Sequence, residues 1–225
     1  MRQKPALFKT LDKVREPDLT ASVPASVLST ILVGVFGVAV GLLAQAAEFF
    51  AENSTVWWQD IVKDLEFNLV FHKFPIWFML GLTVAVCSQR PLKAAINELV
   101  FFIGVIVGFN IVPIIFKDAP KPENLMTWVL IAAVSVPLAM IFWYSKSGSW
   151  PSILFDALII GVLAAYCFDC GLVYFHFTDM IMDLFNAVII ALVAIALATG
   201  IIQFVVSLLG GIIIALVLGP VIQMS

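Results

Sequence analysis

Two acidic residues, Glu98 and Asp156, lie inside long apolar stretches of the sequence. A charged side chain in the hydrocarbon of a bilayer costs about 2.5–3.5 kcal/mol even on the most lenient scale, so such residues normally face other helices or water. A carboxyl group in this setting can bind a proton or a cation. Asn97 and Gln203 lie similarly early in their apolar stretches, and Asn110 precedes a proline that predicts a kink. These five residues form the candidate intramembrane polar site.

A structural role for the two carboxylates is the simpler alternative. Each lies close to the predicted end of its span, where a long basic side chain can extend along the helix to the interface. Three basic residues near these ends are candidate partners in an ion pair, namely Arg90, Lys93 and Lys146. The sequence alone leaves both interpretations open.

A second group of polar residues lies later in the chain. His176, Asp179 and Asp183 are spaced so that they could share one helix face, and imidazole with carboxylates can bind a divalent metal. Acidic residues at the start of a helix also complement its dipole, which accounts for both aspartates without a metal. The C-x-x-C motif of Cys167 and Cys170 ends a predicted span, where the dipole does not favour a thiolate. We therefore predict no metal site and no cofactor.

The composition indicates an integral membrane protein. Hydrophobic residues make up 62% and charged residues 12% of the 225 residues, against about 45–50% and about 25% in soluble domains. The net charge of -3 argues against binding to nucleic acid, for which a basic face is typical. The sequence contains no nucleophile with a base, no phosphate-binding loop and no metalloprotease motif, so we do not expect an enzyme.

The apolar residues fall into about seven runs, and a helix needs ~20 residues to cross the hydrocarbon core. The predicted spans cover residues 23–46, 74–88, 94–116, 125–144, 152–168, 179–198 and 201–222. The first run, of ~20 residues, is longer than the ~7–15 of a signal-peptide core, so we expect it to remain as a span. We predict an all-α polytopic transmembrane helical bundle, with residues 23–225 as a single transmembrane domain.

The basic residues predict the orientation, because short cytoplasmic loops carry an excess of lysine and arginine. With the N-terminus inside, eight of the basic residues are cytoplasmic and four are outside. We therefore predict a cytoplasmic N-terminal segment over residues 1–22 and a C-terminus outside.

The predicted spans form one helix followed by three hairpins, which turn on the cytoplasmic side near residues 91, 148 and 200. A parallel internal repeat, as found in some transporters, is one interpretation. Any chain of alternating spans contains such hairpins, which is the alternative. The polar segment of about residues 54–70 has apolar residues at helical spacing, so we predict an extracytoplasmic amphipathic helix that lies on the membrane surface. It either caps the bundle or covers a substrate site.

Small residues recur four positions apart in three spans. This pattern lets helix backbones approach closely in a membrane. The candidate packing residues are Gly37 and Gly41, Gly104 and Gly108, and then Gly211 and Ala215 with their neighbours Ser207 and Gly219. They predict packing within the chain or, as the alternative, docking of the last span against another membrane subunit. Cys87 lies at an inner helix end, where we expect it to be buried.

Three stretches of the sequence are familiar: FPIW at residues 74–77, SQRPLKAAIN at residues 88–97 and REPDLT at residues 15–20. They resemble a family of small multi-pass bacterial membrane proteins of unknown function. The resemblance implies a bacterial cytoplasmic membrane as the location. Its signature is a turn and a packing pattern, so it implies no activity.

Two functions fit these observations. The kinked spans, Glu98 and Asp156 favour a small-molecule carrier or the substrate-binding subunit of a transporter. The small-residue stripes favour a non-catalytic component that assembles with other membrane subunits. In both cases the lipid bilayer is the surrounding partner, and no nucleic acid is involved.

Overall fold

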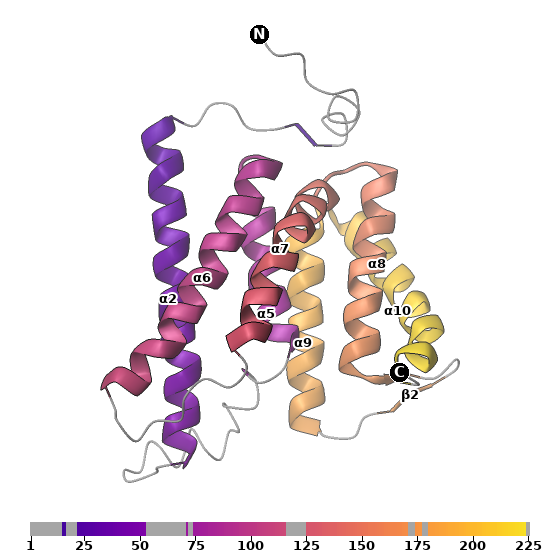
Figure 1. Ribbon diagram of the computed structural model, residues 1–225. Coiled ribbons are helices and arrows are strands. Elements are labelled where there is room, and N and C mark those ends of the chain that lie inside the picture. The colour runs from indigo at the N-terminus through magenta and orange to yellow at the C-terminus, as the bar shows by residue number, and fades with distance from the viewer. Residues whose placement is uncertain are drawn as a thin grey trace. The chain divides into compact units, whose positions relative to one another are not determined.

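The computed structural model describes residues 15–16, 22–52, 71, 74–115, 125–170, 174–176 and 180–223 (Figure 1). Its helices are α2 Val23–Glu52, α5 Phe74–Val86, α6 Pro91–Ile115, α7 Leu125–Ser145, α8 Trp150–Cys167, α9 Met180–Leu197 and α10 Ile201–Gln223. A two-residue antiparallel pairing joins β1 Asp169–Cys170 to β2 Phe175–His176.

The described helices confirm the prediction of an all-helical, multi-pass membrane protein. Six of them are long and apolar enough to cross a bilayer, and α5 is a shorter apolar helix of 13 residues. Many of their large apolar side chains are exposed on the surface of the structure. Contact with lipid explains this exposure. The predicted span ends agree with the observed helices within a few residues, except that α2 continues to Glu52. The predicted amphipathic segment 54–70 lies outside the described residues.

The chain divides into two compact units. The amino-terminal unit covers Asp18–Met140, and the carboxyl-terminal unit is built on Ile141–Ser225. The division falls inside α7, so the units do not follow the predicted hairpins. The first unit contains α2, α5, α6 and most of α7, and the second contains α8, α9 and α10.

Glycines hold α2 and α6 together in the amino-terminal unit. A Cβ atom at Gly37 would overlap the carbonyl oxygen of Phe101, and one at Gly41 would overlap that of Val105. Conversely, a Cβ atom at Gly104 would lie 2.5 Å from the carbonyl oxygen of Gly34. The contact positions rise together along both helices, so α2 and α6 are parallel. The chain between them, which includes α5, must therefore return across the membrane.

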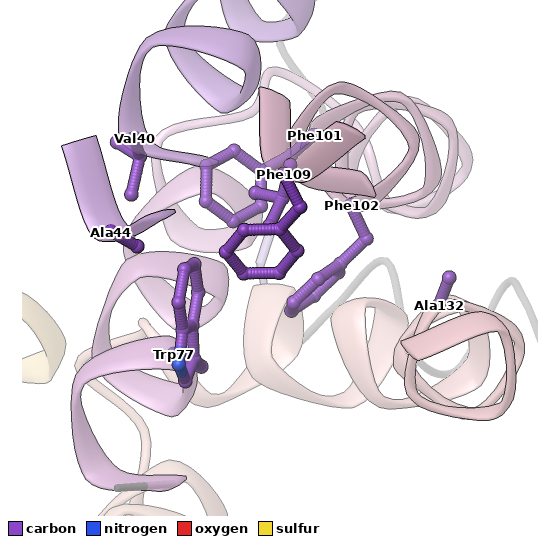
Figure 2. Close-up of a cluster of buried hydrophobic side chains, with 8 residues drawn as sticks. Val40, Ala44, Trp77, Phe101, Phe102, Phe109 and Ala132 are labelled. Carbon is purple, nitrogen blue, oxygen red and sulfur yellow. The ribbon is translucent and has the colours of Figure 1, made fainter. Parts of the chain in front are cut away.

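Aromatic side chains fix α5 and α7 to this pair (Figure 2). Trp77 of α5 contacts Phe109 of α6 edge-on, with ring centroids 5.7 Å apart, and its ring lies 4.8 Å from that of Trp128 in α7. The indole nitrogen of Trp77 donates a hydrogen bond to the carbonyl oxygen of Phe71, at 2.7 Å. Figure 2 shows Trp77 below and to the left of Phe109, with Val40 and Ala44 of α2 at the left of the view. Contacts between aromatic rings therefore hold the short helix α5 against α6 and α7.

The carboxyl-terminal unit repeats the parallel arrangement with α8 and α10. A Cβ atom at Gly211 would lie 2.6 Å from Cγ2 of Ile160, and one at Gly161 would lie 2.9 Å from the carbonyl oxygen of Gly211. Further along, a Cβ atom at Gly219 would overlap the carbonyl oxygen of Cys170. The contact positions again rise together, so α8 and α10 are parallel and α9 supplies the return crossing.

The N-terminal segment contacts this second unit at the end of α7. The guanidinium of Arg15 donates a hydrogen bond of 2.8 Å to the carbonyl oxygen of Trp143 and lies 4.4 Å from the centre of its ring. Residue 15 and the end of α7 therefore lie on the same side of the membrane, as the alternation of the predicted spans requires.

Alanine at Gly41 tests the close approach of α2 and α6. The added methyl group would overlap the α6 backbone, so the helices must separate, and overpacking of this kind costs about 1–3 kcal/mol. We expect a lower thermal unfolding temperature in detergent. Gly200→Ala is the matched control, because nothing lies within 4 Å of its Cβ position. Equal unfolding temperatures for the two variants would contradict the glycine contact.

Candidate functional site

Glu98 is enclosed between α6 and α5 in the amino-terminal unit. Its side chain is 2% exposed, and its carboxyl group lies so close to Gly81 of α5 that a Cβ atom there would overlap Oε1. Among the described residues, no donor forms a hydrogen bond with its Oε2 atom. The absence of a side chain at Gly81 therefore provides the space for this buried carboxyl group.

Lys93 forms a separate polar network towards α2. Its ammonium group donates hydrogen bonds to the carbonyl oxygen of Ser26 and to the hydroxyl of Thr30. The Thr30 hydroxyl lies 2.9 Å from Oδ1 of Asn97, and the Asn97 amide donates a hydrogen bond of 2.9 Å to the hydroxyl of Ser88. The network joins the start of α6 to α2 and to the turn after α5.

The geometry of α6 explains why Lys93 and Glu98 take different partners. Residues five positions apart point to well-separated sides of a helix, whereas neighbours on one face are three or four positions apart. Lys93 and Asn97 therefore face α2, and Glu98 faces α5. In the part of the chain that the structure describes, the predicted ion pair between Lys93 and Glu98 is not formed.

Asp156 and Gln203 are in direct contact in the carboxyl-terminal unit. Asp156 on α8 is fully buried, and its Oδ2 accepts a hydrogen bond of 2.6 Å from the amide of Gln203 on α10. That amide also donates to the carbonyl oxygen of Ser147, at 3.0 Å. The Gln203 side-chain oxygen accepts hydrogen bonds from the backbone and the hydroxyl of Thr199. No residue that the structure describes donates to Oδ1 of Asp156.

The other candidate residues lie apart from these carboxyl groups. Asn110 donates a hydrogen bond of 2.7 Å to the carbonyl oxygen of Ile106, one turn earlier in its own helix. Arg90 is exposed in the turn that precedes α6, and Lys146 is half-buried in the turn that follows α7. Among the candidate residues, the structure brings together Asp156 with Gln203, and it connects Lys93 with Asn97 through Thr30.

The residues of the weak metal candidate are only partly described. Asp179 lies outside the described residues, His176 is described only as part of β2, and Asp183 is buried near the start of α9. Within the described ranges, no three His, Cys, Asp or Glu side chains are grouped to hold a metal ion.

The expectation for Cys87 is wrong, because its side chain is exposed. The cause is local: α5 ends at Val86, so Cys87 lies in the turn rather than in the packed helix. Of the C-x-x-C pair, Cys167 is half-buried and Cys170 is buried, and the two are not joined by a disulfide bond. Sequence reasoning also missed Thr30, Ser88 and Gly81, whose only signal was their small or polar character inside apolar runs.

No protein-family model, no curated protein and no solved structure matches the chain. The family resemblance therefore stays a prediction. The fold by itself defines the class, an integral multi-pass membrane protein, and among the described residues it buries Glu98 in one helical unit and Asp156 and Asp183 in the other.

Leucine at position 203 tests the contact with Asp156. Gln203→Leu removes the hydrogen bond from the Gln203 amide to the Asp156 carboxyl group, and leaving buried polar groups unsatisfied costs about 1–3 kcal/mol. We expect a lower thermal unfolding temperature in detergent. The matched control is Asn110→Leu, because among the described residues that amide donates to a carbonyl oxygen of its own helix. A larger loss in the control would contradict the assigned contact.

Proposed function

We propose that this protein is a carrier of small molecules in which Glu98 and Asp156 bind and release a proton or a small cation during transport. The observation that supports this role is that each helical unit encloses one carboxyl group with an oxygen that accepts no hydrogen bond from the described residues. We place the carrier in a bacterial cytoplasmic membrane, as the sequence resemblance implies.

The energetic argument is that a structural role would favour complete pairing. A buried, unpaired charge is strongly destabilising, and replacing it with an apolar residue of similar size is often neutral or stabilising. Glu98 has no basic partner among the described residues, and Asp156 is bound by an uncharged amide. A proton or cation on the open oxygen would relieve part of the cost. Exchange of that ion would then connect the carboxyl groups to an ion gradient.

The division of the helices also supports a carrier. Many secondary transporters work by moving one helical repeat or bundle against another around a central site. This chain has two separately packed units, each built on a parallel helix pair with a return helix. The close backbone contacts of the glycines lie within each unit.

The alternative of an assembly component has lost its main support. The small-residue stripe of α10 contacts α8 through Gly211, and Ser207 and Ala215 are fully buried. The stripes of α2 and α6 contact each other in the same way. These residues are therefore occupied within the chain, and they are not the surface on which a further membrane subunit would dock.

Transport can be tested with the full-length protein in proteoliposomes that contain a pH-sensitive dye. We expect one class from a panel of amino acids, sugars, nucleosides and carboxylic acids to cause proton movement. A positioned proton-transfer group contributes a rate factor of about a hundred or more. We therefore expect Glu98→Gln and Asp156→Asn each to lower the transport rate at least about tenfold. Circular dichroism and the yield of folded protein should be unchanged.

Glu16→Gln is the matched control, because Glu16 is an exposed carboxylate outside the helices. This variant should transport at the rate of the original protein. Unchanged transport in both the Glu98 and Asp156 variants would contradict the role of the carboxyl groups. Failure of every panel member, in vesicles where an established carrier is active, would contradict a carrier for these solutes.

A further inference from the structure

The side chains around Glu98 are apolar on both helices that enclose it. Residues three or four positions away share its face of α6, and all four of these are buried and apolar, namely Ala94, Ala95, Phe101 and Phe102. On α5 the carboxyl group lies against Gly81, and a Cβ atom there would also lie 3.5 Å from the ring of Phe102. The carboxyl group of Glu98 therefore lies between a glycine and aromatic and alanine side chains.

The ionisable groups of the neighbouring elements lie elsewhere. Lys93 on α6 donates its hydrogen bonds to α2, and Glu48 lies near the opposite end of α2. Neither α5 nor the part of α7 in this unit contains an ionisable residue. Cys87 and Arg90 are exposed in the turn before α6. Among the described residues, no charged group therefore compensates a negative charge on Glu98.

A metal cation needs several oxygen ligands, which replace its hydration shell. In transporters these include backbone carbonyl groups from unwound parts of helices. Helices α5 and α6 run without a break past Gly81 and Glu98, so the carbonyl groups there accept hydrogen bonds within the helices. The one hydroxyl of α5, on Thr83, is exposed and donates to the carbonyl oxygen of Met79. The two helices that enclose Glu98 thus offer its own carboxyl oxygens and no further ligand.

We infer that the ion bound at Glu98 is a proton and that no metal cation takes its place. A proton needs only one carboxyl oxygen, and Oε2 accepts no hydrogen bond from the described residues. Binding of the proton removes the charge, and a neutral carboxyl group costs far less to bury than a carboxylate. This inference rests on the proposed function, because it names the ion that Glu98 binds and releases.

A cavity at the end of the unit that we predict to be cytoplasmic brings water close to this site. It has a volume of about 240 Å³, and six of its nine lining residues have polar side chains. A water molecule occupies about 30 Å³ in the liquid, so the cavity has room for several. Its walls include Asn97, which precedes Glu98 on α6, and Val84, which lies one turn after Gly81 on α5. The proton therefore has a short path between Glu98 and water.

Infrared spectroscopy of the full-length protein in detergent tests the inference without a transported solute. A protonated carboxyl group absorbs above the main protein bands, and its frequency is highest when its carbonyl accepts no hydrogen bond. We expect such a band at neutral pH, and we expect heavy water to move it to lower frequency because the proton exchanges. Its intensity should be equal in sodium, potassium, calcium and choline chloride, since no metal cation replaces the proton.

Two pairs of variants assign the band. Glu98→Gln should abolish it, and Asp156→Asn should keep it, because Asp156 accepts a hydrogen bond from Gln203 and would absorb at lower frequency. Gly81→Ala keeps the test decisive if Glu98→Gln fails to fold. Its methyl group would overlap Oε1 of Glu98, so the band should change frequency. Gly200→Ala is the matched control, because nothing lies within 4 Å of its Cβ position.

The inference is overturned if the original protein lacks the band, or if heavy water leaves the band in place. It is also overturned if a metal chloride lowers the band relative to choline chloride, or if Glu98→Gln retains it. A lower band in sodium chloride together with transport in proteoliposomes would leave the carrier proposal intact with a different ion. An unchanged band without transport of any solute in the panel would contradict the carrier proposal alone.

Discussion

The close contact of glycine backbones is the constraint on which both helical units depend. In lipid, helices gain little from burying apolar side chains against one another, so they associate through close packing and polar contacts. Gly37 and Gly41 bring α2 onto α6, and Gly161 and Gly211 bring α8 onto α10. These contacts set the rotation of each helix and therefore decide where its polar residues point.

The position of each buried carboxyl group follows from that rotation. On α6, the face of Asn97 and Gly104 is turned towards α2, which leaves Glu98 facing Gly81 of α5. On α8, the face that meets Gly211 also carries Asp156, so this carboxyl group reaches Gln203 on α10. The same kind of glycine contact therefore places the two carboxyl groups in different environments, one with an amide donor and one without.

The sequence predicted the helices well, because hydropathy alone identifies a span, but it predicted their partners poorly. Adjacent spans suggested hairpins, whereas the most intimate pairs join the first and third helices of each unit. Lys93 is close to Glu98 in sequence, yet its ammonium group binds Ser26 and Thr30 on a helix more than sixty residues earlier. Small and polar residues such as Gly81 and Ser88 acquire their roles only when the rotation of the helices is known.

Pulsed electron spin resonance measures the parallel pairing of α2 and α6 most directly. Spin labels at Val27 and Ile96, which line the same cavity, are compared with labels at Val27 and Ile114, with the native cysteines replaced. A parallel pair predicts that the second distance exceeds the first by about 20–27 Å, because a helix rises ~1.5 Å per residue. A shorter distance from Val27 to Ile114 than to Ile96 would show an antiparallel pair and contradict the fold described for this unit.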